Sequence, residues 1–197
     1  AADYFKENRG TIVNKTVIEF GAAGSLPSLV ALALGAHFLC CTDYPNDALI
    51  KSINKQFDSN GFSEARGKSF ECKGHLWGSD TKQLLDLIQT NNDTEKRFYD
   101  VVILAELLWN DTYLQHESLL TSVDAVLAQD GSVYVAHTHH NVGEEHLDME
   151  FFKRASSQFS FDVRTVKVRH DLVYIDSSED DVSPVYLRVM TRAKGAK

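Results

Sequence analysis

Short apolar runs alternate with longer segments of helical composition along the whole chain. The strand-like runs lie at residues 17–21, 37–42, 69–73, 100–105, 133–136, 161–168 and 185–190. Helical patterns lie at 26–35, 45–57 and 113–128, and a further helix is expected around Phe151 and Phe152. The run at 100–105 is the clearest strand, because its apolar residues are continuous as in a buried parallel sheet. This alternation predicts βαβ units.

No helical pattern separates the last two strand-like runs, and an acidic turn at 177–181 lies between them. Two strands without an intervening helix predict an antiparallel hairpin at one edge of the sheet. The predicted fold class is therefore α/β: a Rossmann-like three-layer sandwich whose seven-stranded sheet is mostly parallel, in a single domain over 1–197. We expect Gly131 to end the helix at 113–128, and residues 90–97 to form a solvated loop.

Charge and cysteine content narrow the class of protein. The chain has 20 Lys and Arg residues and 28 Asp and Glu residues, which gives a net charge of −8. This charge disfavours a broad surface for binding nucleic acid. No apolar stretch reaches the roughly 18 residues that a membrane span requires. Cys40, Cys41 and Cys72 are expected to be reduced core thiols, as in a cytoplasmic protein. The sequence begins at Ala1, without Met. We expect the protein to act as a monomer.

A loop of small residues at 19–25 follows the first predicted strand and precedes the first predicted helix. Ligands of open α/β sheets bind at this junction, where small residues let backbone N–H groups approach closely. Asp43 follows about 20 residues later, at the end of the second strand, where a carboxylate can bind ribose hydroxyls. The alternative is a tight βα turn followed by a helix-capping Asp43.

Two other nucleotide-binding classes are disfavoured. A dehydrogenase would need G-x-G-x-x-G spacing, a Tyr-x-x-x-Lys pair and room for a substrate domain, and the chain meets none of these requirements. The segment at 61–69 approaches a P-loop, but five residues separate Gly61 and Gly67 where four are required, and it does not follow the first strand.

Several segments together resemble one known family. They are VIEFGAAGSLPSLVALALGA at 17–36, Thr42-Asp43-Tyr44-Pro45, Gly74-His75-Leu76-Trp77-Gly78, LAELLWN at 104–110, Thr138-His139-His140 and Asp148-Met149-Glu150-Phe151-Phe152. The chain resembles the class I seven-β-strand methyltransferases, in the nicotinamide N-methyltransferase-like branch. That branch includes a fungal enzyme that methylates the N-terminal region of translation elongation factor 1A. Ser25 departs from the family's usual glycine and Asn141 from a common proline. We also expect the family's N-terminal segment before Ala1 to be missing.

The resemblance implies S-adenosylmethionine (SAM) as cofactor and no metal. The implied cofactor-binding residues are Glu19, Gly21, Ala22, Gly24, Asp43, Tyr44, Trp77 and Ala105. Glu19 and Gly21 would lie near the methionine end of SAM, and Asp43 near its ribose. Trp77 would border the adenine, where an aromatic ring can stack on a base, although core packing is an alternative role for it.

The implied catalytic residues are Glu106, Trp109 and Asn110 in the segment that follows the fourth predicted strand. Glu106 and Trp109 resemble the family's acidic-x-x-aromatic motif, so Glu106 would orient an ammonium group and Trp109 would hold it by a cation–π contact. Alternatively, Glu106 is a helix N-terminal residue and Trp109 belongs to the core. The histidines His137, His139, His140 and His146 indicate a substrate-lining loop or a solvated loop, since no metal-ligand pattern accompanies them.

The predicted function is SAM-dependent N-methylation of a protein lysine or N-terminal α-amine, with elongation factor 1A as the target implied by the resemblance. One alternative is methylation of a small amine such as nicotinamide. Another is a catalytically silent methyltransferase-like domain that acts as a binding module, an option raised by Ser25.

Overall fold

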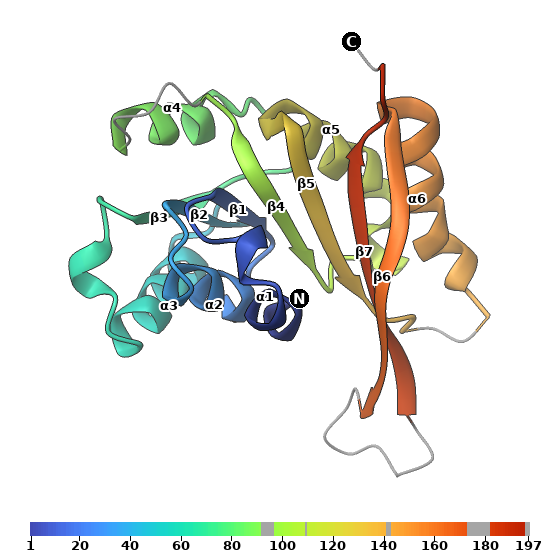
Figure 1. Ribbon diagram of the computed structural model, residues 1–197, viewed down its shortest axis with the longest axis horizontal. Coiled ribbons are helices and arrows are strands. Elements are labelled where there is room, and N and C mark those ends of the chain that lie inside the picture. Colours follow the sequence, from blue (N-terminus) through green and yellow to red (C-terminus); the bar gives the residue numbers. More distant parts are fainter. Residues whose placement is uncertain (92–96, 109, 141–142, 173–181, 196–197) are drawn as a thin grey trace.

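The computed structural model describes residues 1–91, 97–108, 110–140, 143–172 and 182–195. Within these ranges seven strands form one sheet in the order β3-β2-β1-β4-β5-β7-β6 (Figure 1). The strands are β1 Thr16–Phe20, β2 Phe38–Asp43, β3 Phe70–Gly74, β4 Tyr99–Ala105, β5 Leu127–His137, β6 Phe161–Leu172 and β7 Val182–Arg192. Strands β1 to β5 pair in parallel, and β7 pairs antiparallel with both β5 and β6. The predicted mostly parallel sheet with an edge hairpin is confirmed.

Helices cover both faces of the sheet, as Figure 1 shows. On one face lie α1 Ala2–Glu7, α2 Leu26–Ala33 and α3 Asp47–Ser59, and on the other α4 Lys82–Asn91, α5 His116–Val126 and α6 Glu145–Phe159. The side chains of successive strand residues point to opposite faces of the sheet. Val17 packs with the first group of helices, and Ile18 packs with the second. This arrangement confirms the three-layer sandwich.

The chain changes its direction of travel across the sheet after β3. Strands β1, β2 and β3 run outward from the centre to one edge, and β4 returns to the other side of β1. In open α/β sheets such a reversal opens a crevice beyond the carboxyl ends of the two central strands. Here those ends are Phe20 of β1 and Ala105 of β4.

The prediction that Gly131 ends a helix is wrong. Helix α5 ends at Val126, Leu127 is already extended, and Gly131 lies inside β5. The register shifts nearby, because Leu127 pairs with Tyr99 while Ser132 pairs with Val101. Glycine suits this irregularity because a Cβ at Gly131 would lie 2.7 Å from Cδ1 of Leu127.

Other boundaries also differ from the predicted ones. The helix expected from residue 113 begins at His116, and the 3₁₀ helix η3, Asn110–Gln115, precedes it. Helices α1 and α4 were not predicted, and α4 extends to Asn91 into the stretch expected to be a loop. Residues 92–96 and the acidic turn at 177–181 lie outside the described residues. In the described part of the chain no helix is both long enough and apolar enough to span a membrane.

Candidate active site

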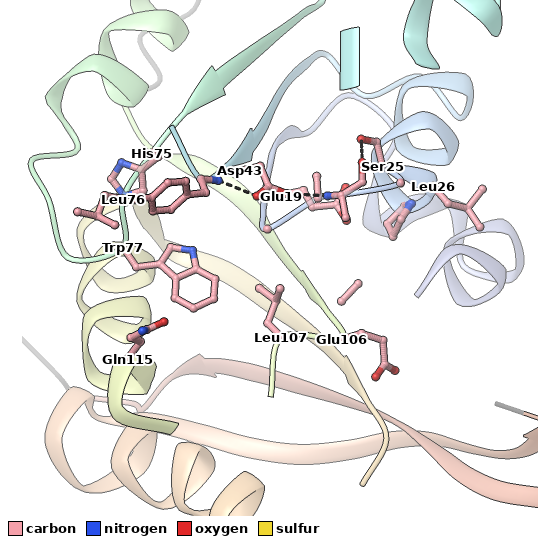
Figure 2. Close-up of a pocket in the computed structure, with 17 residues that line it drawn as sticks. Glu19, Ser25, Leu26, Asp43, His75, Leu76, Trp77, Glu106, Leu107 and Gln115 are labelled. Atoms are coloured by element: carbon pink, nitrogen blue, oxygen red, sulfur yellow. Dashed lines mark hydrogen bonds between the residues drawn. The ribbon is translucent and has the colours of Figure 1, made fainter. Parts of the chain in front are cut away.

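A cavity of about 730 Å³ opens beyond the carboxyl ends of β1, β2 and β4 (Figure 2). This volume falls within the roughly 300–1,000 Å³ of small-molecule sites. The lining residues are Glu19, Gly21, Ala22, Ala23, Gly24, Ser25, Leu26, Pro27, Asp43, Tyr44, His75, Leu76, Trp77, Ala105, Glu106, Leu107 and Gln115. The structure therefore brings together all eight predicted cofactor residues and Glu106. Trp109 and the side chain of Asn110 lie outside the described residues, so their predicted roles stay predictions.

The loop between β1 and α2 reaches the cavity through an unusual backbone path. Gly21 has φ +61°, and a Cβ there would lie 2.5 Å from Cδ2 of Leu107. Ala23 and Ser25 also have positive φ, at +40° and +55°. Ser25 occupies the N-cap of α2 in the left-handed conformation and gives no side-chain cap bond. The usual glycine of the resembled family would adopt this conformation without strain, whereas serine adopts it at a cost.

Asp43 connects the ends of two strands. Its Oδ2 accepts a hydrogen bond from the backbone N–H of Ala23 at 2.7 Å, and its Oδ1 accepts one from Tyr44 at 2.6 Å. The alternative in which Asp43 caps a helix is wrong, because Asn46 caps α3 by accepting bonds from the N–H groups of Ala48 and Leu49. The Asp43 carboxylate instead lines the cavity beside the loop of β1.

Glu19 is a buried acid on the cavity wall. Its Oε2 accepts a hydrogen bond from the backbone N–H of Ser28 at 3.0 Å. Burial raises the pKa of Glu19 to about 7, because removing water disfavours the ionised form. The lining also holds the carboxylates of Asp43 and Glu106, and among the described residues that line it there is no Lys or Arg. Such a set favours a cationic ligand, so the residues fit SAM, which carries a sulfonium and an ammonium group.

Trp77 and His75 border the opposite part of the cavity from Glu106, as Figure 2 shows. Nε2 of His75 lies 2.9 Å from Oγ of Ser122, and that Oγ accepts a bond from the N–H of Gly78 at 2.8 Å. These bonds fix the loop at 75–78 against α5. Trp77 is half-buried and packs against the core as well as lining the cavity, and its predicted place beside the adenine stays a prediction.

Three histidines lie at the end of β5 or just after it, and His139 and His140 have separate partners. Nδ1 of His139 lies 2.8 Å from Oδ2 of Asp148, and Nε2 of His140 lies 2.9 Å from Oε2 of Glu106. His137 is fully buried, and burial lowers its pKa to about 3. Within the described residues no group of three or more His, Cys, Asp and Glu side chains is arranged to hold a metal ion.

Sequence reasoning missed several residues of the site. His75, Leu76 and Leu107 line the cavity and lie in segments that carry the family resemblance, so their place beside Trp77 and Glu106 was the available signal. Gln115 comes from η3, which no pattern predicted. The contacts of Thr138 and His140 with Glu106 depend on strand pairing that the sequence does not display.

Related sequences and solved structures agree with the fold, although no family model matches the chain. The chain is 33% identical over 200 residues to the protein N-terminal and lysine N-methyltransferase EFM7 of Gibberella zeae. The matched region covers 98% of this chain and 73% of the relative. The YcgJ protein of Bacillus subtilis shares the fold with a TM-score of 0.68 at 9% identity, over 98% of both chains. SMU.776, solved in complex with SAH, aligns with a TM-score of 0.57 at 11% identity, over 94% of this chain and 49% of that chain.

The fold, the carboxylate-lined cavity and these likenesses together define a class I SAM-dependent methyltransferase. Within that class, the chain belongs to the family of the EFM7 protein N-terminal and lysine N-methyltransferases.

Proposed function

We propose that this protein transfers a methyl group from SAM to an amino group of a protein, either a lysine side chain or an N-terminal α-amine. The names of its relatives support this class of acceptor. The observation that carries the proposal is the cavity itself, where Glu106 lies apart from the region of His75 and Trp77. A site with a carboxylate at the far end from the adenine-binding region suits a cationic acceptor.

Each lining residue then has a physical task. The backbone of the 21–25 loop comes close to the methionine part of SAM, and Glu19 faces its cationic groups from a buried position. Asp43 accepts hydrogen bonds from the ribose hydroxyls, and Tyr44 and Trp77 provide apolar surface for the adenine. When bound, SAM supplies an electrophilic methyl carbon, so the protein needs to provide alignment and exclusion of water.

The acceptor must release a proton to water before its nitrogen attacks, since a lysine has a pKa near 10.4 and an α-amine near 7.7–8.0 and both are largely protonated near neutral pH. The bond from nitrogen to the methyl carbon would then form as the bond from that carbon to the sulfur of SAM breaks, and S-adenosylhomocysteine would leave. Glu106 is the carboxylate at the acceptor end and pairs with the incoming ammonium, which brings the nitrogen to the methyl carbon. Leu107 and Ala105 close the wall next to it. Trp109 and Asn110, which follow in the chain, are proposed as further acceptor contacts on the resemblance alone.

The rim of the cavity supports access by a macromolecule. Leu26, Tyr44 and Leu76 line the cavity, and these residues are 61%, 61% and 54% exposed. Translation elongation factor 1A is the target that we propose, by resemblance, and a cytoplasmic location follows from that target. The net charge of −8 supports a protein partner over a nucleic acid. Action as a monomer stays a prediction.

Labelling with tritiated SAM tests the proposal. Purified elongation factor 1A, nicotinamide and a cell lysate are incubated separately with the protein, and the labelled residue is located by mass spectrometry. We expect label on an amine of the elongation factor. Label on nicotinamide alone would replace the proposal with the small-amine alternative. SAM binding without label on any acceptor would favour the silent binding module.

A further inference from the structure

We propose that Thr138 and His140 are positioning residues of the methyl transfer, which hold the Glu106 carboxylate in the orientation that receives a cationic amine. This inference rests on the proposed function, because it concerns the same acceptor end of the cavity. It assigns a task to Thr138 and His140, which are not among the residues that line the cavity.

The three side chains form a closed triangle of hydrogen-bonding atoms. Oγ1 of Thr138 donates to Oε2 of Glu106 at 2.9 Å, and Nε2 of His140 lies 2.9 Å from the same oxygen. Oγ1 of Thr138 and Nε2 of His140 are 3.0 Å apart. An ionised carboxylate only accepts hydrogen bonds, so Nε2 of His140 carries its proton in this arrangement. Two hydrogen-bonding partners on one oxygen hold Oε2 of Glu106 in place.

Strand pairing places these groups together. Ala105 at the end of β4 pairs with Ala136 near the end of β5, so the residues that follow each strand lie side by side. The backbone N–H of Glu106 donates to the carbonyl of Ala136 at 2.8 Å, which anchors the base of the side chain. Glu106 lies at the margin of the cavity, and its backbone is tied to β5, the strand that its two hydrogen-bonding partners follow.

The backbone at Glu106 is strained. Its φ is +55°, in the left-handed region that residues other than glycine rarely adopt. Such a conformation costs of order 1–3 kcal/mol and persists only where the surroundings determine it, commonly at functional sites. The hydrogen bonds of Glu106 to Ala136, Thr138 and His140 are the surrounding contacts that stabilise this conformation. They hold the carboxylate beside the cavity instead of letting it relax toward solvent.

Thr138 and His140 are more buried than the Glu106 carboxylate that they contact. Thr138 is 2% exposed, so water does not compete for its hydroxyl. The side chain of His140 is 17% exposed, while that of Glu106 is 40% exposed. The supporting groups are thus more shielded than the carboxylate they hold, and the carboxylate keeps access to an incoming ligand. A fixed anion selects ammonium acceptors and aligns their nitrogen, which affects turnover more than binding of SAM.

Matched substitutions test this role with purified elongation factor 1A as acceptor and a cell lysate in parallel. Thr138→Val keeps the shape and removes the hydroxyl, and Thr138→Ser keeps the hydroxyl. His140→Ala removes the donor, and His140→Gln retains an N–H donor. We expect Thr138→Val and His140→Ala to lower kcat by about 10- to 100-fold, because misplacement of a reacting group by about 1 Å has effects of this size. Thr138→Ser and His140→Gln should recover most of the rate.

Affinity for S-adenosylhomocysteine, measured by calorimetry, should stay unchanged in all four variants, and circular dichroism confirms folding. His37→Ala is the matched control, because His37 is exposed and precedes β2, at the opposite end of that strand from the cavity. The deciding measurement is a double-mutant cycle with Glu106→Ala. Residues that act through Glu106 should have less than about a twofold further effect on kcat once that side chain is gone.

The outcomes separate the two proposals. Equal losses from Thr138→Val with and without Glu106 would overturn the positioning role, as would full activity of both Thr138→Val and His140→Ala. If Thr138→Val fails to fold, the His140 pair decides. Wild-type protein that labels neither acceptor source would overturn the proposed function and this inference together. An active wild type with no coupling to Glu106 would overturn this inference alone.

Discussion

The carboxylate of Asp43 accepts a hydrogen bond from the backbone N–H of Ala23, at 2.7 Å, and so connects the end of β2 with the loop that follows β1. Because the same carboxylate also accepts from Tyr44, both of its oxygens are held in place before a ligand arrives. A preorganised acceptor at this position costs no further ordering on binding.

Asp43→Ala should weaken SAM binding by about 1–3 kcal/mol, since ribose hydroxyls would lose a charged acceptor. The affinity of Asp43→Asn for SAM should fall between those of the wild type and Asp43→Ala, because the amide oxygen of Asn still accepts a hydrogen bond. Isothermal titration calorimetry measures the effect, and Asp47→Ala, at an exposed position in the first turn of α3, is the control. Unchanged affinity in Asp43→Ala would mean that this residue serves only the turn.

Ser25→Gly should raise the free energy of unfolding by about 0.5–1 kcal/mol. Ser25 has φ +55°, and glycine adopts this conformation without the clash of a Cβ. For a chain of this size the expected rise in Tm is roughly 2–4 °C per kcal/mol. Ser156→Gly, on an exposed helical position of α6, should instead lower Tm. A fall in Tm for Ser25→Gly would show that the serine hydroxyl matters more than backbone strain.

Gly21→Ala should abolish SAM binding or reduce it severely. A Cβ at Gly21 would lie 2.5 Å from Cδ2 of Leu107, and φ is +61°. Either the loop or the end of the Leu107 side chain must shift, and both residues line the cavity. The double variant Gly21→Ala, Leu107→Ala should recover part of the affinity by removing the clash, while the backbone strain persists. Calorimetry on the single and double variants measures this, and wild-type affinity in the single variant would contradict it.

Glu19 should make stability depend on pH. Burial raises its pKa from 4.5 to about 7 in the folded state, so the folded protein binds this proton more tightly than the unfolded chain. The contribution to stability is fully present below pH 4.5 and is lost as pH rises through about 7. Its loss approaches about 3 kcal/mol at alkaline pH.

Glu19→Gln cannot ionise, so its free energy of unfolding relative to wild type should increase between pH 5 and pH 8. Urea denaturation at several pH values measures the difference, and using the difference removes the effect of other titrating groups, including the histidines. A difference that does not change with pH would show that Glu19 ionises freely in the folded protein.

Much of the fold was predictable because strand signals are local. Runs such as 100–105 are apolar enough to indicate a buried strand without knowledge of its neighbours. Helix α4 is not among the predicted elements, although its apolar residues follow a helical spacing that the sequence does display: Leu84, Leu85, Leu87 and Ile88. The end of α5 was misplaced because the glycine signal at Gly131 reports a strand irregularity, which depends on pairing with β4.

The cofactor end of the site was predictable to a greater extent than the acceptor end. Glu19, the small-residue loop and Asp43 occur at strand ends, so their meeting follows from parallel strand order. The contacts of Glu106 with Thr138 and His140 require the exact β4–β5 register, and no sequence spacing between 106 and 140 reports it. The pKa of Glu19 was equally hidden, since it results from burial in three dimensions.

Strand β6 forms one outer edge of the sheet, and its construction bears on how neighbouring molecules meet. Its register with β7 shifts between Thr165 and Lys167, which interrupts the regular pleat. Lys167 and Arg169 form ion pairs with Glu7 and Asp3 of α1, at 2.5 and 2.7 Å. An interrupted and charged border is a poor template for another strand. The long hairpin of β6 and β7 can therefore extend the sheet without offering an edge that pairs with a second copy. Such edge-to-edge pairing is a hazard that grows with protein concentration in a crowded cell.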